Sequence, residues 1–131
     1  MFEFTDEVKR VLEQTEVVTI GTCGPHGVHL VATWGEFIRN LGVHDGDVLL
    51  IPAGGYRRTE ENLSRNPRLE ALIGSKVPAS LCGGKAVGTG FRLSGSGEVQ
   101  TSGKWFEMVK AKYAWARGAL VIRVDKAEKL L

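Results

Sequence analysis

Hydrophobic and polar residues alternate with two different periods along the chain, and the period changes from segment to segment. Near the N-terminus, Phe4, Val8, Val11 and Leu12 recur at helical spacing. Thr5 precedes most of this pattern and is a residue type that caps helices well. The chain is therefore predicted to begin with a short amphipathic helix.

Three strand-like segments follow this helix. Residues 17–22 and 28–33 are rich in β-branched side chains and flank the turn residues 23–27, which predicts a β-hairpin. Residues 48–51 form a third apolar run that Pro52 is expected to close, because proline cannot donate to a sheet.

The middle of the chain returns to a helix and then to a strand. Thr59 is expected to cap a short helix that Asn66 and Pro67 end, and residues 69–73 predict the next strand. The segment 76–88 is rich in glycine and has no period, so we expect an exposed loop there.

In the last third, residues 89–100 alternate but contain interior glycines, which indicates a strand with a bend or bulge. Helical spacing of Trp105, Met108 and Val109 predicts another helix. Residues 119–124 predict the final strand, followed by a tail at 125–131.

About six strands with two or three short helices predict a mainly β protein, arranged as a small antiparallel barrel, because strands that close on one another leave few open edges. With 131 residues, the whole chain 1–131 is expected to form a single domain. Hydrophobic residues at 43% and charged residues at 24% are ordinary for a folded protein.

Charge and cysteine content exclude several function classes. The net charge of +2 is spread without a like-signed block, so no nucleic-acid partner is predicted. No apolar run approaches the roughly 20 residues that cross a bilayer, so no membrane partner is predicted either. Cys23 and Cys82 lack the spacing of a zinc site or a disulfide framework, which favours the reducing cytoplasm.

The segment 51–62 carries the clearest candidate chemistry. Gly54 and Gly55 can bring backbone N–H groups close to a ligand, and Arg58 and Thr59 follow at the expected start of a helix. These parts predict an anion site suited to a phosphate. The alternative is a surface turn followed by a solvated basic pair, and the spacing of a P-loop is missing.

No other cluster indicates catalysis or metal binding. His26, His29 and His44 lack the spacing of metal ligands, so no metal is predicted. Cys23 has no adjacent base that could activate its thiol. No catalytic residue is therefore assigned.

Several segments, in the same order and at similar spacing, resemble one family over almost the whole chain. They are residues 17–22, 30–34, 51–55, 58–60, 88–91 and 115–122. The chain resembles the pyridoxamine 5′-phosphate oxidase-like split-barrel flavoproteins, among them the small FMN-binding proteins of sulfate-reducing bacteria. The resemblance implies a six-stranded antiparallel split β-barrel that binds FMN at the interface of a homodimer.

The resemblance also implies roles for particular residues. Arg58 and Thr59 fall where the family holds the phosphate, with Thr33 as a second hydroxyl donor. Arg57 takes the place of Arg58 if the register shifts by one residue. Leu131 corresponds to a residue that reaches the flavin of the partner subunit, and a frayed tail is the alternative.

The flavin ring is expected to lie against three aromatic side chains and one stretch of backbone. Trp34, Phe37 and Trp115 match aromatic positions around the ring, and the alternative is that all three are core residues. Phe37 stands where the family has a tyrosine. The backbone amides of the remaining candidates could meet the polar edge of the flavin; these are Pro52, Ala53, Gly54 and Gly55.

The function that follows from the resemblance is electron transfer between FMN and an unknown redox partner. The absence of an obvious general acid or base favours a carrier over an enzyme. Two alternatives stay open. One is a flavin-dependent oxidoreductase of the same fold, either an NAD(P)H:flavin reductase or a pyridoxamine phosphate oxidase-like protein, and the other is a flavin-free ligand-binding split barrel.

Overall fold

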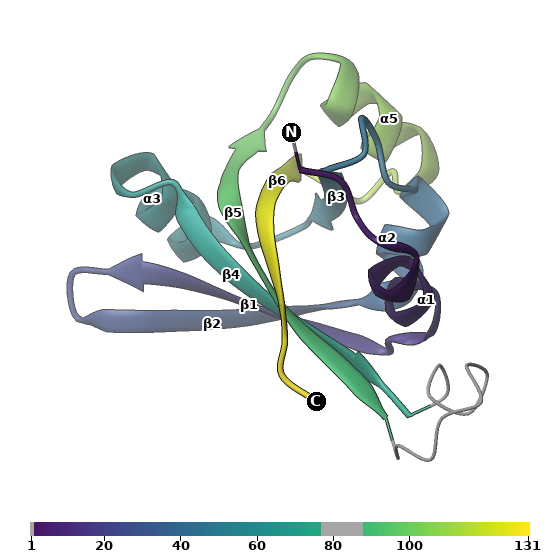
Figure 1. Cartoon of the computed structure of the whole chain (residues 1–131). Coiled ribbons are helices and arrows are strands. Elements are labelled where there is room, and N and C mark those ends of the chain that lie inside the picture. The colour runs from purple at the N-terminus through teal and green to yellow at the C-terminus, as the bar shows by residue number, and fades with distance from the viewer. Residues whose placement is uncertain (1, 77–87) are drawn as a thin grey trace.

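The computed structural model describes residues 2–76 and 88–131. Within them, six strands and four helices follow one another along the chain (Figure 1). Their bounds are α1 (Asp6–Gln14), β1 (Val17–Gly24), β2 (Gly27–Trp34), α2 (Gly35–Leu41), β3 (Val48–Ala53), α3 (Arg57–Arg65), β4 (Arg68–Ser75), β5 (Thr89–Gln100), α5 (Lys104–Lys112) and β6 (Gly118–Lys129). The predicted mainly β fold with six strands is confirmed.

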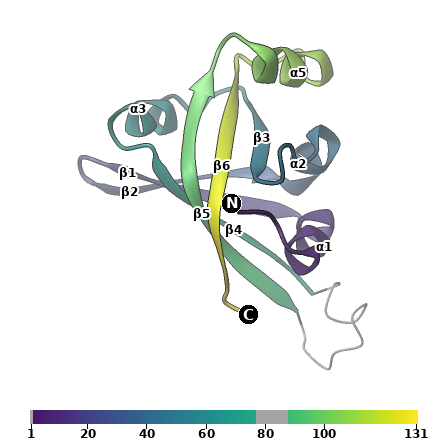
Figure 2. The same cartoon turned by 45° about the horizontal axis from the view of Figure 1, so that its top comes forward.

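All six strands belong to one antiparallel sheet with the order β2-β1-β4-β5-β6-β3. The sheet curls strongly, and α3 lies beside the β1–β2 hairpin (Figures 1 and 2). Helix α1 packs inside the curl, whereas α5 packs on the opposite face of β3. Strands β2 and β3 each pair on one side only. The barrel is therefore split between these two edge strands instead of closed all round.

The edge position of β3 explains an unexpected feature of that strand. Pro52 was predicted to close the strand, but it lies inside β3 opposite Ala119 of β6. A proline without an N–H is tolerated there, because no strand of the described residues lies on the other side of β3 to accept a hydrogen bond.

Two hydrophobic clusters fill the molecule. The larger one lies inside the curl of the sheet, and the smaller one joins β3 and β6 to α5 around Trp105 and Val109. Every residue of β3 is buried, because alternate side chains enter one cluster and then the other: Leu49 and Ile51 face the curl, and Val48 and Leu50 face α5. This burial on both faces holds the edge strand in place without a second strand partner.

Local predictions near the N-terminus and in β5 are confirmed. The Thr5 hydroxyl accepts a hydrogen bond of 3.3 Å from the Val8 N–H at the start of α1. The predicted irregularity of the glycine-containing strand lies between Ser94 and Gly95, where the register with β6 shifts. A Cβ at Gly95 would lie 2.1 Å from the Arg123 carbonyl oxygen, so the close approach of the β5 and β6 backbones at this point requires glycine.

The structure corrects the predicted start of α3. Thr59 does not cap this helix, because the helix begins at Arg57 and Tyr56 precedes it with φ 61°. Thr59 is the third helical residue and is fully buried. The capping prediction relied on residue type alone, whereas the helix is preceded by the left-handed residue Tyr56, three residues before the predicted cap.

Two further predictions are corrected. The described residues form four helices, not two or three, because the short helix α2 follows Trp34 without a capping side chain that would mark its start in the sequence. Most of the predicted tail 125–131 is strand, since β6 continues to Lys129.

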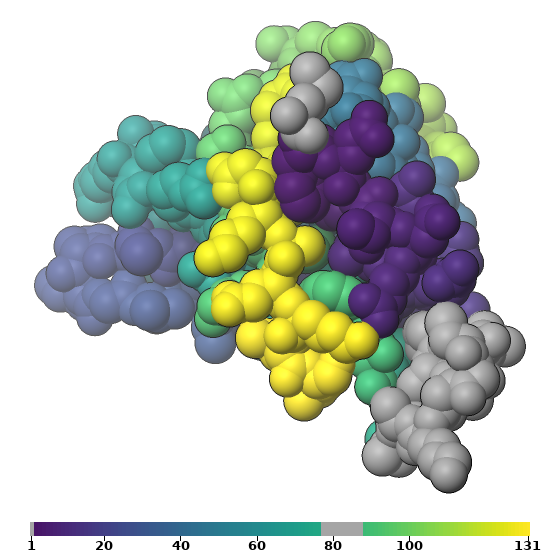
Figure 3. Space-filling model, viewed as in Figure 1, coloured from purple at the N-terminus to yellow at the C-terminus, as the bar shows by residue number. Residues whose placement is uncertain are grey.

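The two ends of the chain lie side by side. The Lys129 ammonium pairs with Glu7 at 2.8 Å. On the surface, the N-terminal segment lies beside the C-terminal strand (Figure 3).

The predicted loop at 76–88 lies almost entirely outside the described residues. Among the helices that are described, none combines the length and hydrophobicity needed to cross a membrane.

Candidate functional site

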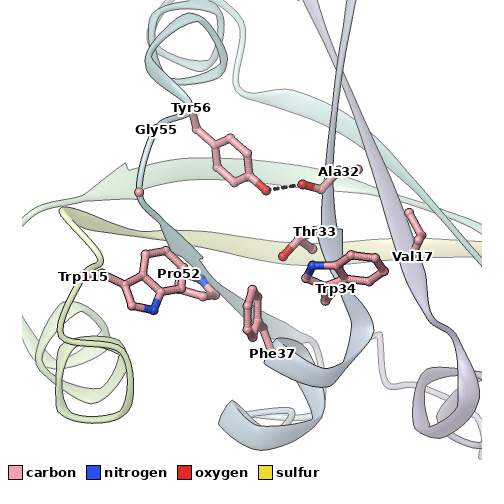
Figure 4. A pocket seen from close by; sticks show the side chains of 10 residues that line it. Val17, Ala32, Thr33, Trp34, Phe37, Pro52, Gly55, Tyr56 and Trp115 are labelled. Atoms are coloured by element: carbon pink, nitrogen blue, oxygen red, sulfur yellow. Dashed lines mark hydrogen bonds between the residues drawn. The ribbon is translucent and has the colours of Figure 1, made fainter.

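A pocket of about 430 Å³ opens where the barrel is split (Figure 4). Its volume falls in the range of small-molecule sites, which run from roughly 300 to 1,000 Å³. Strand β2 forms one side of it, and the end of β3 with the turn that follows forms the other. The lining residues are Val17, Ala32, Thr33, Trp34, Phe37, Pro52, Gly54, Gly55, Tyr56 and Trp115.

Large aromatic side chains form the walls of this pocket. Trp34 lies on the side of β2 and Trp115 on the side of β3, with Phe37 between them in Figure 4. Trp34 is 57% exposed and Trp115 is 55% exposed, so neither is a core residue. Phe37 packs against Trp115 with ring centroids 5.8 Å apart. A concave, apolar surface is typical of a site that binds a ligand or a partner protein.

Tyr56 links the two sides of the split. Its hydroxyl donates a 2.6 Å hydrogen bond to the Ala32 carbonyl oxygen on β2 (Figure 4). Burial raises the pKa of the Tyr56 phenol, and a hydrogen bond with the Thr33 side chain offsets part of that rise. The left-handed backbone of Tyr56 is unusual for a residue with a side chain, and such conformations concentrate at functional sites.

The turn between β3 and α3 carries unpaired backbone donors. Within the described residues, the N–H groups of residues 54–58 donate no backbone hydrogen bond, and Tyr56 provides no side-chain cap. Free N–H groups at the start of a helix attract anions. Gly54 also packs closely, because a Cβ there would lie 3.1 Å from the Trp115 ring.

Most of the predicted cofactor-binding residues meet in this pocket, including Thr33, a predicted hydroxyl donor to the phosphate. Those that line it are Thr33, Trp34, Phe37, Pro52, Gly54, Gly55 and Trp115. Ala53 is fully buried at the end of β3, next to the pocket in sequence. The pocket therefore brings together candidates from three separate segments of the sequence.

The predicted phosphate residues lie at the start of α3. The Arg58 side chain is exposed and lines a separate pocket with the β1–β2 turn and Asn62. The Thr59 hydroxyl is buried and is the one buried side-chain N or O atom of the described chain without a hydrogen-bond partner. A buried hydroxyl without a partner in the first turn of a helix is suited to hydrogen-bond a bound ligand.

Leu131 lies away from the pocket of its own chain. It is largely exposed and lines a surface hollow with Gly74 and Thr89. The structure therefore does not bring Leu131 together with the other candidates within one subunit.

Several residues that build the site were missed from the sequence. Tyr56 and Ala32 join the two edges, and Arg117 hydrogen-bonds the Gly55 carbonyl from a position 62 residues away. The sequence did contain a pattern that could have identified Tyr56, since it directly follows Gly54 and Gly55. No such pattern marks Arg117, because Gly55 is brought near it only by the pairing of β3 with β6.

Comparison with known proteins gives a consistent result. The family model described as pyridoxamine 5′-phosphate oxidase matches residues 4–130. An FMN-binding protein of Nitratidesulfovibrio vulgaris, strain Miyazaki F, is 41% identical over 121 residues, which cover 92% of this chain and 93% of the relative.

Solved structures share the fold at low sequence identity. HupZ from Group A Streptococcus has a TM-score of 0.74 at 17% identity, covering 97% of this chain and 94% of its own. A putative pyridoxamine 5′-phosphate oxidase from Lactobacillus delbrueckii has a TM-score of 0.69 at 16% identity, covering 96% of this chain and 93% of its own. The match of the family model over nearly the whole chain, together with the 41% identical relative, shows that this chain belongs to the pyridoxamine 5′-phosphate oxidase family.

Proposed function

We propose that this protein binds FMN in the pocket at the split of the barrel and acts in electron transfer. The observation that carries the proposal is the combination of two half-exposed tryptophans, Trp34 and Trp115, with a row of unpaired backbone N–H groups beside them. A ligand with a flat apolar ring and an anionic end matches both parts. The 41% identical relative that is named an FMN-binding protein supports the same ligand.

The residues present fit FMN in chemistry. Trp34, Phe37 and Trp115 offer aromatic faces and edges for the ring. The backbone of Gly54 and Gly55 offers donors for its polar edge. Bound FMN supplies the redox chemistry, while the chain binds it, orients it and keeps water away.

The phosphate is proposed to bind at the start of α3. Arg58 is exposed there and can donate a fork of hydrogen bonds, and the Thr59 hydroxyl lacks a partner. Thr33 contributes a further hydroxyl from β2. The positive end of the helix dipole adds to the attraction for a phosphate.

The lining of the pocket favours an electron carrier over an enzyme. Tyr56 is the one ionisable side chain among the ten residues that line it, and burial raises its pKa above the ordinary 10.0. The phenol therefore stays neutral near pH 7 and is a poor acid or base there. The electron donor and acceptor are proposed to be other proteins. A cytoplasmic location is part of the proposal, since Cys23 is a free, exposed thiol.

The family description favours one second candidate, a flavin-dependent oxidoreductase. We would add NADH, NADPH or pyridoxamine 5′-phosphate to the FMN-loaded protein under anaerobic conditions and follow the flavin absorption. Rapid bleaching by any of them supports an enzyme. An unchanged spectrum supports the carrier.

A homodimer with FMN at its interface is also proposed. The outer face of β1, β2 and β4 exposes Val28, Leu30 and Leu72, which together form an apolar surface unusual for a monomer. Strand β2 carries this face and also one wall of the pocket, so a second copy seated here would cover both. Leu131, exposed at the C-terminus, is proposed to reach the partner's flavin.

Light scattering tests the dimer. Leu30→Lys should give a monomer and weaken FMN binding, because a buried lysine would oppose the interface. Met108→Lys is the control, since Met108 is an exposed apolar residue on α5 outside this face. A Leu30→Lys variant that stays dimeric would argue against this interface.

The absorption spectrum of the purified protein and titration with FMN and riboflavin test the cofactor. In the double variant Arg58→Ala/Thr59→Ala, FMN should bind at least about tenfold more weakly, because one charge-assisted hydrogen bond contributes roughly 1.5–3 kcal/mol. Riboflavin, which lacks the phosphate, should be little affected. Ser64→Ala/Arg65→Ala, later in the same helix, is the control. A colourless protein with no spectral change on adding FMN would favour a flavin-free binding protein.

A further inference from the structure

Arg117 makes an unusual set of contacts with the turn that borders the pocket. Its Nε and Nη2 atoms donate to the Gly55 carbonyl oxygen at 3.0 and 2.6 Å. Its Nη1 atom lies 3.0 Å from Glu60 Oε1 in α3. Its own backbone N–H donates to the Ala53 carbonyl oxygen at 2.9 Å. One residue between α5 and β6 therefore holds three points of the segment 53–60.

These contacts decide which way the peptide groups of the turn point. Both the Ala53 and the Gly55 carbonyls are directed at Arg117, and the described chain contains no cis peptide bond. In a planar trans peptide the following N–H points away from the carbonyl. The N–H groups of Gly54 and Tyr56 are thus directed away from Arg117, and both residues line the pocket.

Arg117 also neutralises a carboxylate close to the proposed phosphate site. Glu60 lies in the first turn of α3, one residue after Thr59. Its negative charge would repel an anion bound at that helix end. The Arg117 side chain is only 20% exposed, so its pairing with Glu60 is screened less by salt than an exposed pair.

We propose that Arg117 is a positioning residue for the phosphate of FMN, an inference that rests on the proposed function. It acts without touching the phosphate. The guanidinium holds the Gly55 carbonyl away from the site so that the backbone N–H of Tyr56, just before α3, stays available, and it cancels the charge of Glu60. Lysine cannot replace it fully, because an ammonium lacks the two-pronged donor geometry.

The test compares FMN with riboflavin on the apoprotein of each variant, using quenching of flavin fluorescence. In Arg117→Gln, FMN affinity should fall about tenfold, a difference of about 1.4 kcal/mol, while riboflavin affinity falls less than threefold. Arg117→Lys should lose part of the FMN affinity, because it keeps the charge but not the fork. General damage to the pocket would lower both affinities together, so their ratio isolates the effect on the phosphate.

Two further variants separate charge from geometry. Adding Glu60→Gln to Arg117→Gln should restore part of the lost FMN affinity. The unpaired Glu60 carboxylate is then gone, but the Gly55 carbonyl still lacks the guanidinium that held it. Lys129→Gln is the matched control, because it also leaves a carboxylate unpaired, that of Glu7 in α1, which lines neither the pocket nor the hollow beside Arg58. It should leave the FMN-to-riboflavin ratio unchanged.

The outcomes distinguish this inference from the proposed function. If the wild-type protein does not bind FMN, the proposed function fails. If the wild type binds FMN and a folded Arg117→Gln keeps the wild-type ratio of the two affinities, the role of Arg117 is refuted. Should Arg117→Gln not fold, the same ratio measured on Arg117→Lys decides, and a wild-type ratio there refutes it equally.

Discussion

Replacing Tyr56 with phenylalanine should weaken the closure of the split barrel by a predictable amount. The variant removes the hydrogen bond from the Tyr56 hydroxyl to the Ala32 carbonyl at 2.6 Å and the one with the Thr33 side chain, and it keeps the ring. Ala32 is exposed, so water can replace the donor lost there. The free energy of unfolding should therefore fall by about 1 kcal/mol, and the melting temperature by about 4 °C.

The pH dependence of the same variant gives a second, independent reading. Burial raises the pKa of Tyr56 in the folded protein above its ordinary value of 10.0. The unfolded chain then loses the phenol proton first, so the contribution of Tyr56 to stability is complete below pH 10.0 and declines as the pH rises toward the folded pKa. This alkaline decline should be smaller in Tyr56→Phe.

Urea denaturation from pH 7 to 11 measures both effects. Tyr113→Phe is the matched control, since it removes a hydroxyl that contacts Asn40 instead of joining the two edge strands. The reasoning is refuted if Tyr56→Phe matches the wild type at pH 7 to within about 0.3 kcal/mol, or if it declines above pH 10 as steeply as the wild type.

Three further substitutions test other parts of the structure. Gly95→Ala should lower the free energy of unfolding by at least about 2 kcal/mol, because its Cβ would lie 2.1 Å from the Arg123 carbonyl oxygen; a melting curve close to that of the wild type would contradict this close approach. Thr5→Ala should reduce stability by about 1 kcal/mol through loss of the α1 cap, measured by thermal unfolding, and no loss would mean that the cap is not needed. Gly54→Ala should leave the melting temperature nearly unchanged and weaken FMN binding in a titration, because the new methyl group pushes on the half-exposed Trp115 ring; unchanged affinity would place the ring of the ligand elsewhere.

How much could be read from the sequence differs between strands, helices and site. The hairpin and the glycine-containing strand were predictable, because alternation and turn residues act over a few neighbouring positions. The start of α3 was not, since the residue that precedes the helix is Tyr56 in a left-handed conformation that residue type does not suggest. Helix α2 lacks a capping residue, and so it left no start signal in the sequence.

The sequence by itself determined the order of the elements, the glycine turn before two arginines and the tryptophans that stand out in a chain with 8% aromatic residues. These features are local, and short-range propensity and spacing are enough to read them. The family resemblance implied a split barrel and a ring site shared by Trp34 and Trp115. Only the tertiary structure decided that the open edges are β2 and β3, and that Arg117 holds the Gly55 carbonyl. Those relations depend on strand pairing between segments far apart in the chain, and no local pattern carries that information.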